Sequence, residues 1–319
     1  MKKFEKKERQ VSPVRPVANG SPERPLTAGR QVGSDETGPL LAWLLAALKP
    51  MSRTRVKELL QRGHVSVNGT ATTRFDHPLE PGDRVDIAHT KPPIEALARA
   101  GLSLVHVDDH LIVVDKPAGL LTVATEGERT RTAFAILLDH LQARDMGRPH
   151  VVHRLDRETS GLLLFARSKE VRDLLQSQWS AVVKTYLGVV EGVPRPPEGT
   201  VRSRLAEGNN LRVRKVEDPD DPAHARLAVT RYKVLEKNKD NALLEVVLKT
   251  GRKHQIRVHM ADLGCPIIGD GAYGAKTDPA RRLGLHAFRL DFKHPATGLP
   301  MTFQSPLPDV LKRVMHPKK

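Results

Sequence analysis

The stretch VVHRLDRETSGLLLFARS, at residues 151–168, places one carboxylate directly before a buried strand. Asp156 lies between Arg154 and Arg157, and the apolar run LLLF follows Gly161. An acid among fixed cations stays ionised, and a short apolar run of this kind is typical of a buried strand. The stretch therefore predicts an anion at the mouth of a strand, where it can act as a nucleophile, a base or a salt-bridge partner.

A second dense stretch, KTGRKHQIRVHMADLGCPIIGD at residues 249–270, predicts a helix that begins among cations. Ile256, Met260 and Leu263 recur at the spacing of one helix face, and Gly264 suits the end of the helix. The cations near its start are Lys249, Arg252, Lys253 and Arg257. A helix start of this composition favours an anionic partner.

The histidines of this stretch do not predict a metal site. His254 and His259 are five residues apart, so their rings diverge on a helix, and no third ligand is evident nearby. Cys265 is the only cysteine, which excludes an intramolecular disulfide and favours a reducing compartment. The chain also lacks a P-loop and a GxGxxG dinucleotide fingerprint. We therefore expect no metal and no cofactor.

The 319 residues carry a formal net charge of +15. Such charge favours a polyanionic partner such as nucleic acid, because each lysine or arginine on a phosphate releases a counterion. A charge that serves only solubility is the alternative. No apolar segment approaches the ~20 residues that cross a bilayer, and no secretory signal is evident. We expect a cytoplasmic protein with no membrane partner.

Composition divides the chain into four parts. Residues 1–37 are rich in proline and mixed charge, which predicts a disordered basic tail. Residues 38–88 predict a pair of helices and short strands, and residues 89–99 predict a linker. Residues 100–319 contain short strands in hairpin-like pairs interrupted by helices. This pattern predicts an α+β domain with a mixed, largely antiparallel sheet.

The amino-terminal part has a basic helix, which by itself is usually only a solvated face. However, MSRTRVKELLQRGHVSVNG followed by LEPGDRVDI resembles the S-four-like RNA-binding domain, named after a ribosomal small-subunit protein. The resemblance covers residues 38–88 and implies a small α+β domain that contacts RNA mainly through phosphates and sugars. The implied contact residues are Ser52, Arg53, Arg55 and Lys57.

The larger part contains LIVVDKPAGLL, HRLDRETSGLLLFARS, KTYLGVVEG and TGRKHQIRVHMADLGCPIIGD in this order. Together these motifs resemble the RluA-type family of RNA pseudouridine synthases over residues 100–310. The resemblance implies a long sheet crossed by an RNA cleft. It implies that Asp156 is the catalytic aspartate, that Tyr186 stacks on the target base, and that Arg257 pairs with the aspartate. The supporting or RNA-contacting residues would be Arg154, Arg252 and His254.

Some of these residues have a second interpretation on the sequence alone. Tyr186 can be a stacking platform for a nucleobase or a core residue whose hydroxyl is satisfied. Asp115 and Lys116 can be catalytic, or they can be charges that anchor a loop.

The implied reaction breaks the bond from the uracil nitrogen to the sugar, turns the base and rejoins it through a ring carbon. Nothing is oxidised, reduced or hydrolysed, so the chemistry requires no cofactor. Asp156 would attack the anomeric carbon or remove the neighbouring sugar proton. Arg257 would favour the ionised carboxylate and orient it, and Tyr186 would hold the detached uracil.

Two departures from the family pattern bear on substrate choice. After KPAGLL the chain continues TVAT, where many relatives have a histidine-proline loop. Leu187 and Gly188 follow the tyrosine, where a small alanine is frequent. We expect these loops to line the RNA cleft without contacting the reacting atoms.

Two other classes of function fit part of the pattern. A non-catalytic RNA-binding or ribosome-assembly factor would not need Asp156, Tyr186 and Arg257 together. An RNA N-glycosidase commonly requires two opposed carboxylates, and the sequence offers no convincing second acid. By family analogy we expect a monomer that acts on large-subunit ribosomal RNA, with transfer RNA as the alternative substrate.

Overall fold

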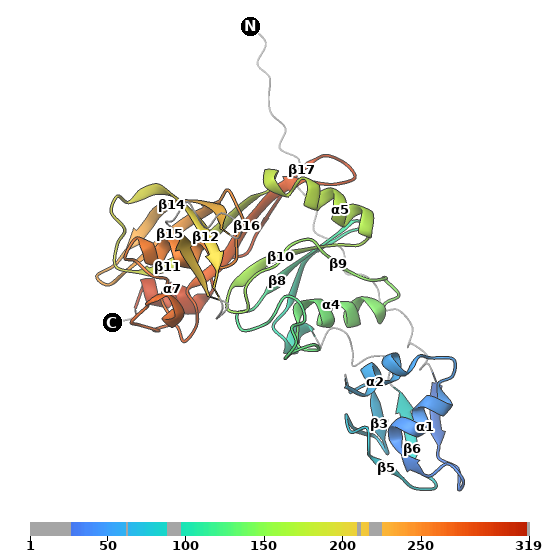
Figure 1. Cartoon of the computed structure of the whole chain (residues 1–319). Helices are drawn as coiled ribbons and strands as arrows, with labels where there is room; N and C mark the ends of the chain where they lie inside the picture. Colours follow the sequence, from blue (N-terminus) through green and yellow to red (C-terminus); the bar gives the residue numbers. More distant parts are fainter. Residues whose placement is uncertain (1–26, 62, 88–96, 209–211, 217–224, 318–319) are drawn as a thin grey trace. The chain divides into compact units, whose positions relative to one another are not determined.

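The computed structural model describes residues 27–61, 63–87, 97–208, 212–216 and 225–317. The chain divides into two compact units, residues 1–89 and residues 90–319 (Figure 1). We call them the amino-terminal unit and, because it contains the predicted catalytic residues, the catalytic unit, and we treat each by itself. The predictions for residues 1–26 and for residues 88–96 lie outside the described residues.

The amino-terminal unit contains a four-stranded sheet in the order β1-β6-β3-β4, a short β2-β5 pair and two helices (Figure 1). Its elements are β1 (Thr27–Gln31), β2 (Gly38–Pro39), α1 (Leu40–Ala47), α2 (Arg53–Gln61), β3 (Val65–Val67), β4 (Thr70–Ala71), β5 (Pro78–Leu79) and β6 (Arg84–Ile87). The two helices lie where leucine spacing predicted them. Leu44 and Leu60 are fully buried between the helices and the sheet.

The predicted tail is too long at its carboxyl-terminal end. β1 lies within residues 1–37 and pairs antiparallel with β6, and the following residue, Val32, is buried in the core of the unit. A five-residue edge strand obtains its backbone hydrogen bonds from its neighbour, so it needs little apolar periodicity of its own. For that reason the sequence pattern did not reveal it.

The catalytic unit is built on one large sheet. Its elements are β7 (Ser103–Val107), β8 (Leu111–Lys116), α4 (Ala133–Gln142), β9 (His150–Val151), β10 (Ser160–Ala166), α5 (Lys169–Ser177), η1 (Trp179–Ala181), β11 (Val183–Glu191), β12 (Glu198–Glu207), β13 (Val213–Val216), β14 (Arg226–Lys237), β15 (Asn241–Leu248), α6 (Gln255–Asp262), η2 (Gly271–Tyr273), β16 (Leu285–Lys293), β17 (Pro300–Gln304) and α7 (Asp309–Met315). Among the described residues, no helix is long and apolar enough to cross a membrane.

The eleven strands follow the order β13-β12-β14-β15-β11-β16-β10-β8-β7, with β17 beside β16 and β9 beside β10. The β10–β16 pair is parallel and the other pairs of this sheet are antiparallel. Figure 1 shows the sheet running through the unit with helices beside it. The prediction of an α+β fold with a mixed, largely antiparallel sheet is confirmed.

The strand β10 is covered on both faces. Leu163 and Phe165 pack with α4 residues, whereas Leu162 and Leu164 pack on the opposite side with Leu175 of α5. All seven residues of β10 are buried. A strand covered on both faces is apolar at every position, which explains why LLLF shows no alternation.

The predicted linker also ends too late. Residues 97–99 are helical, and Leu97 is buried in the same core cluster as Leu137 of α4. The last residues assigned to the linker therefore belong to the packed catalytic unit. Pro92 and Pro93 predict a linker, and Leu97 alone is too weak a signal to predict a packed helix.

Candidate active site

A cavity of about 660 Å³ in the catalytic unit brings together residues from distant parts of the chain. Its lining comes from the loop before β10, from β11 and from the start of α6. All six site residues predicted for this unit line it: Asp156, Tyr186, Arg257, Arg154, Arg252 and His254. A cavity of this size suits a small organic group such as a nucleotide.

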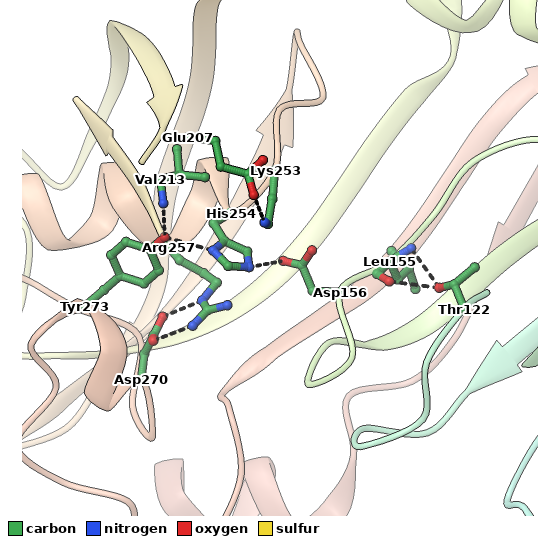
Figure 2. Close-up of polar contacts among 10 residues, drawn as sticks. All are labelled: Thr122, Leu155, Asp156, Glu207, Val213, Lys253, His254, Arg257, Asp270 and Tyr273. Atoms are coloured by element: carbon green, nitrogen blue, oxygen red, sulfur yellow. Dashed lines mark hydrogen bonds and ion pairs between the residues drawn. The ribbon is translucent and has the colours of Figure 1, made fainter. Parts of the chain in front are cut away.

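The backbone on both sides of Asp156 is held in place. Thr122 Oγ1 donates to the carbonyl of Leu155 at 2.8 Å and accepts from the N–H of Leu155 at 3.1 Å (Figure 2). On the other side, the carbonyl of Arg157 accepts from Lys116 Nζ at 3.1 Å and from the N–H of Gly119 at 2.8 Å. The loop that carries the carboxylate is thus fixed before any ligand binds.

Lys116 acts as an anchor. Its side chain is fully buried, and its ammonium group also donates to the carbonyls of Pro117 and Leu120. Burial lowers the pKa of Lys116 to about 7. Asp115 accepts from Ser305 Oγ at 2.5 Å. Lys116 therefore anchors the loop, as one interpretation of the sequence expected, whereas Asp115 binds the segment that follows β17.

Gly161 allows β16 to approach the loop that carries Asp156. Its φ is +112°, and a Cβ on this residue would lie 2.3 Å from the carbonyl oxygen of Ala287. Gly161 pairs with Ala287 in the parallel contact between β10 and β16. A larger residue would push β16 away and displace the loop that holds Asp156.

The carboxylate of Asp156 faces the cavity. Its side chain is 31% exposed, and its nearest ionic partner among the described residues is His254, whose Nε2 lies 4.0 Å from Oδ2 (Figure 2). Tyr186, on β11, is half-buried and lines the same cavity. Burial and then the charge of Asp156 raise the pKa of Tyr186, so its hydroxyl remains neutral.

Arg257 does not pair with Asp156 as predicted. Its Nε and Nη2 donate to the two carboxylate oxygens of Asp270, each at 2.7 Å (Figure 2). The side chain of Asp270 is only 1% exposed. Burial acts to lower the pKa of Arg257, but the hydrogen bonds and charge of Asp270 raise it overall. The bidentate geometry makes Asp270 the preferred partner, and Arg257 remains in the cavity wall near Asp156.

Asp270 and Tyr273 are site residues that the sequence analysis missed as functional. Asp270 ends the second motif, and Tyr273 is one of only three tyrosines. The guanidinium carbon of Arg257 lies 4.9 Å from the centroid of the Tyr273 ring. The sequence signal that could have indicated them is their position: an acid and a rare tyrosine follow a helix whose start is rich in cations.

His254 is held by an unusual backbone conformation. It precedes α6 with a φ of 52°, in the left-handed region that non-glycine residues seldom occupy. Such conformations persist only where the surroundings determine them, and they cluster at functional sites. The conformation directs the imidazole between Tyr273 and Asp156 (Figure 2).

A second wall of the cavity contains Trp179 and Lys184. The ring of His153 stacks on Trp179 with centroids 4.6 Å apart, and the Nζ of Lys184 lies 5.3 Å from the indole. His153 Nε2 accepts from the N–H of Leu164, and burial lowers the pKa of His153 to about 3. His153 is therefore a neutral structural residue beside Asp156.

The remaining cations of the cavity differ in their contacts. Arg252 is half-buried, and its Nε donates to the carbonyl of Leu227 at 3.1 Å. Arg154 is exposed at the cavity. His259 lies in the core instead, where it contacts Ser203 and Thr230. His254 and His259 thus point to different surroundings. Among the described residues, no group of three or more His, Cys, Asp or Glu side chains could hold a metal ion.

The residues predicted to bind RNA in the amino-terminal unit lie at the start of α2. Ser52 Oγ accepts from the N–H of Arg55 at 3.3 Å and so caps the helix. Arg55 pairs with Glu58 at 3.2 Å, and the Nζ of Lys57 lies 6.0 Å from the Phe75 ring. Ser52 and Arg53 are exposed. These four residues, Ser52, Arg53, Arg55 and Lys57, form what we call the α2 surface.

Comparison with known proteins supports one family. The model of the RNA pseudouridylate synthase family matches residues 110–262. An uncharacterized RNA pseudouridine synthase of Bacillus subtilis is 33% identical over 91% of this chain and 96% of its own length. The ribosomal large subunit pseudouridine synthase D of Neisseria meningitidis serogroup A is 35% identical over 88% of this chain and 79% of its own length.

The fold agrees with these sequence relationships. The structure of human RNA pseudouridylate synthase domain containing 4 is 29% identical and aligns with a TM-score of 0.58, covering 70% of this chain and 95% of that chain. The match to the family model, residues 110–262, includes all six predicted site residues that line the cavity. The chain belongs to the RluA-type family of RNA pseudouridine synthases, the isomerases that convert uridine in RNA to pseudouridine.

Proposed function

We propose that Asp156 is the catalytic carboxylate of this pseudouridine synthase. The observation that carries the proposal is the convergence of Asp156, Tyr186 and several cations in one cavity, although they are far apart in the sequence. Asp156 is the exposed acid of that cavity, whereas Asp270 is buried against Arg257. A reacting sugar can therefore reach Asp156 but not Asp270.

The other residues have supporting roles in this proposal. Tyr186 supplies an aromatic face for the uracil, and its neutral hydroxyl adds no charge beside the carboxylate. Arg257 contributes a fixed positive charge that favours the anionic Asp156 at a distance. Arg154, Arg252 and His254 line the same cavity, where they support the site or contact the RNA. The bond from C1′ to the uracil nitrogen breaks, the base turns, and C1′ rejoins a ring carbon.

The uridine must leave its stack before its sugar can reach Asp156, which costs a few kcal/mol. Contacts between phosphates and basic side chains supply compensating free energy. We assign part of this binding to the amino-terminal unit as an S-four-like RNA-binding module that uses Ser52, Arg53, Arg55 and Lys57. The names of several relatives, among them the Neisseria enzyme, indicate large-subunit ribosomal RNA as the substrate.

The role of Asp156 is tested with the isosteric variant Asp156→Asn. We expect the variant to lose pseudouridine formation by at least about 10⁴-fold while it binds the RNA as tightly as the wild type. The matched control is Glu158→Gln, which removes the same charge from an exposed position two residues away. Normal turnover by Asp156→Asn would refute the assignment. Release of free uracil by the wild type would indicate a glycosidase.

The substrate is tested by mapping pseudouridines in total RNA from cells with and without the gene. We expect one or a few sites to disappear from large-subunit ribosomal RNA. Re-expression of the wild type should restore them, and re-expression of Asp156→Asn should not. Loss confined to transfer RNA would overturn the ribosomal assignment and leave the assignment of Asp156 intact.

A further inference from the structure

The hydroxyl of Tyr273 lies between two nitrogen atoms. The N–H of Val213, the first residue of β13, donates to the hydroxyl oxygen at 3.0 Å. Nδ1 of His254 lies 2.8 Å from the same oxygen (Figure 2). A tyrosine hydroxyl has a single hydrogen, and burial raises the pKa of Tyr273, so that hydrogen is retained. Because Val213 can only donate, the hydroxyl hydrogen is left for His254.

This arrangement determines the tautomer of His254. If Tyr273 donates to Nδ1, that nitrogen is unprotonated, and a neutral imidazole must then have its hydrogen on Nε2. In the reverse arrangement, Nδ1 would donate and the tyrosine hydrogen would have no acceptor among the described residues. Burial lowers the pKa of His254 and so favours the neutral ring, although the charge of Asp156 acts in the opposite direction.

We propose that Tyr273 is a positioning residue that holds His254 as the Nε2–H tautomer and thereby gives Asp156 a neutral hydrogen-bond donor. Nε2 lies 4.0 Å from Asp156 Oδ2, so a small closure when RNA binds would make the hydrogen bond. A neutral donor orients a carboxylate without pairing it to a full positive charge, so the carboxylate keeps more of its reactivity. The inference rests on the proposed role of Asp156.

Tyr273 is itself fixed from several sides. Its ring lies beneath the guanidinium group of Arg257, which Asp270 holds through two hydrogen bonds. Its N–H donates to the carbonyl of Asp270 at 3.0 Å. The rings of His254 and Tyr273 meet edge to face, with centroids 5.6 Å apart and planes at 83°. The ion pair of Arg257 and Asp270 therefore supports the tyrosine, and the tyrosine supports the histidine.

The first test reads the tautomer in the intact wild-type protein. Histidine is labelled with ¹⁵N, and His254 is assigned by the signals that disappear in His254→Gln. At neutral pH we expect Nε2 to carry the hydrogen and Nδ1 to have the shift of an unprotonated nitrogen that accepts a hydrogen bond. A hydrogen on Nδ1, or a doubly protonated ring, in the wild-type protein would overturn the proposal.

The second test removes only the hydroxyl. In Tyr273→Phe the ring remains beneath Arg257, but the hydrogen bond to Nδ1 is lost. We expect both tautomers of His254 to appear, and the single-turnover rate constant to fall about tenfold with the RNA Kd unchanged. The matched control is Tyr232→Phe, which removes a tyrosine hydroxyl that donates to Pro196 at 3.1 Å and should change neither measurement.

The two proposals can fail separately. If Tyr273→Phe keeps the wild-type tautomer or the wild-type rate constant, Tyr273 has no positioning role, whatever Asp156 does. If Asp156→Asn remains active, the proposed catalytic role of Asp156 is wrong. The tautomer of His254 measured in the wild type remains valid in that case. A merely structural role for Tyr273 would reduce the fraction of folded protein and leave the tautomer of the folded fraction unchanged.

Discussion

The cavity of the catalytic unit and the α2 surface of the amino-terminal unit are both rich in positive charge, but they hold it differently. In the cavity, Arg257 is 11% exposed and its guanidinium is locked to Asp270. On the α2 surface, Arg55 is 42% exposed beside a similarly exposed Glu58, and Arg53 faces solvent.

The difference follows from burial. A buried charge must be paired and hydrogen-bonded, so its geometry is fixed and its removal exposes a large desolvation cost. An exposed charge is screened by water and salt, so its pairs contribute little to stability and remain available to a phosphate. The cavity is therefore built for chemistry at one position, whereas the α2 surface suits attraction to RNA.

The largest effect is expected from breaking the buried pair. Asp270→Ala leaves the buried Arg257 without its partner, which should destabilise the catalytic unit by about 3–5 kcal/mol. The matched variant Glu58→Ala on α2 should cost less than about 1 kcal/mol. Hydrogen exchange of α6 and α2 peptides in the intact chain measures both. Equal effects of the two variants would contradict the comparison.

Acid should weaken the catalytic unit through His259. This histidine is fully buried, and burial lowers its pKa to about 4, whereas the unfolded value is about 6.5. Below pH 6.5 only the unfolded chain takes up the proton, so the contribution is fully present above that pH and is lost as pH falls toward 4. The expected slope is at most about 1.4 kcal/mol per pH unit.

The measurement is urea unfolding followed by Trp179 fluorescence in a Trp43→Phe background, because Trp43 belongs to the other unit. The slope between pH 6.5 and pH 4.5 should be smaller in His259→Gln than in the parent. Identical slopes would show that His259 does not titrate differently in the folded and unfolded states.

A smaller effect is expected where the loop that carries Asp156 is anchored. Thr122→Val removes both hydrogen bonds to Leu155 from a buried site, at a cost of about 1–3 kcal/mol. Because Asp156 follows Leu155, we expect kcat to fall about tenfold or more with little change in KM. The control is Thr302→Val on β17, which removes an exposed hydroxyl bond to Asp291. Unchanged kcat in Thr122→Val would show that the loop holds without this anchor.

The smallest effect is expected on the α2 surface. Arg53→Gln removes one exposed cation, so the slope of log K for RNA against log salt should shrink by somewhat less than one. Turnover at saturating RNA should not change. Arg74→Gln, in the same unit but outside the α2 surface, is the control and should change the slope less than Arg53→Gln does. A fall in kcat for Arg53→Gln would show that the α2 surface affects the chemical step.

Thr122 lies in a segment that departs from the usual family pattern. The segment TVAT was expected to influence substrate choice and not the chemistry. In the structure its threonine fixes the backbone beside Asp156, while its other residues line the cavity. The contact joins residues 33 positions apart, so no local pattern could reveal it.

The sequence by itself determined many of the strands, the main helices and, through the family motifs, six of the residues that line the cavity. Apolar periodicity and glycine positions are local properties, and the motif order carried the family. Only the tertiary structure decided which side chains of the site bond to one another. Arg257 bonds to Asp270, and Tyr273 reaches both Val213 and His254. Charge pairing depends on distances of a few ångströms between distant segments, and residue spacing along the chain does not contain that information.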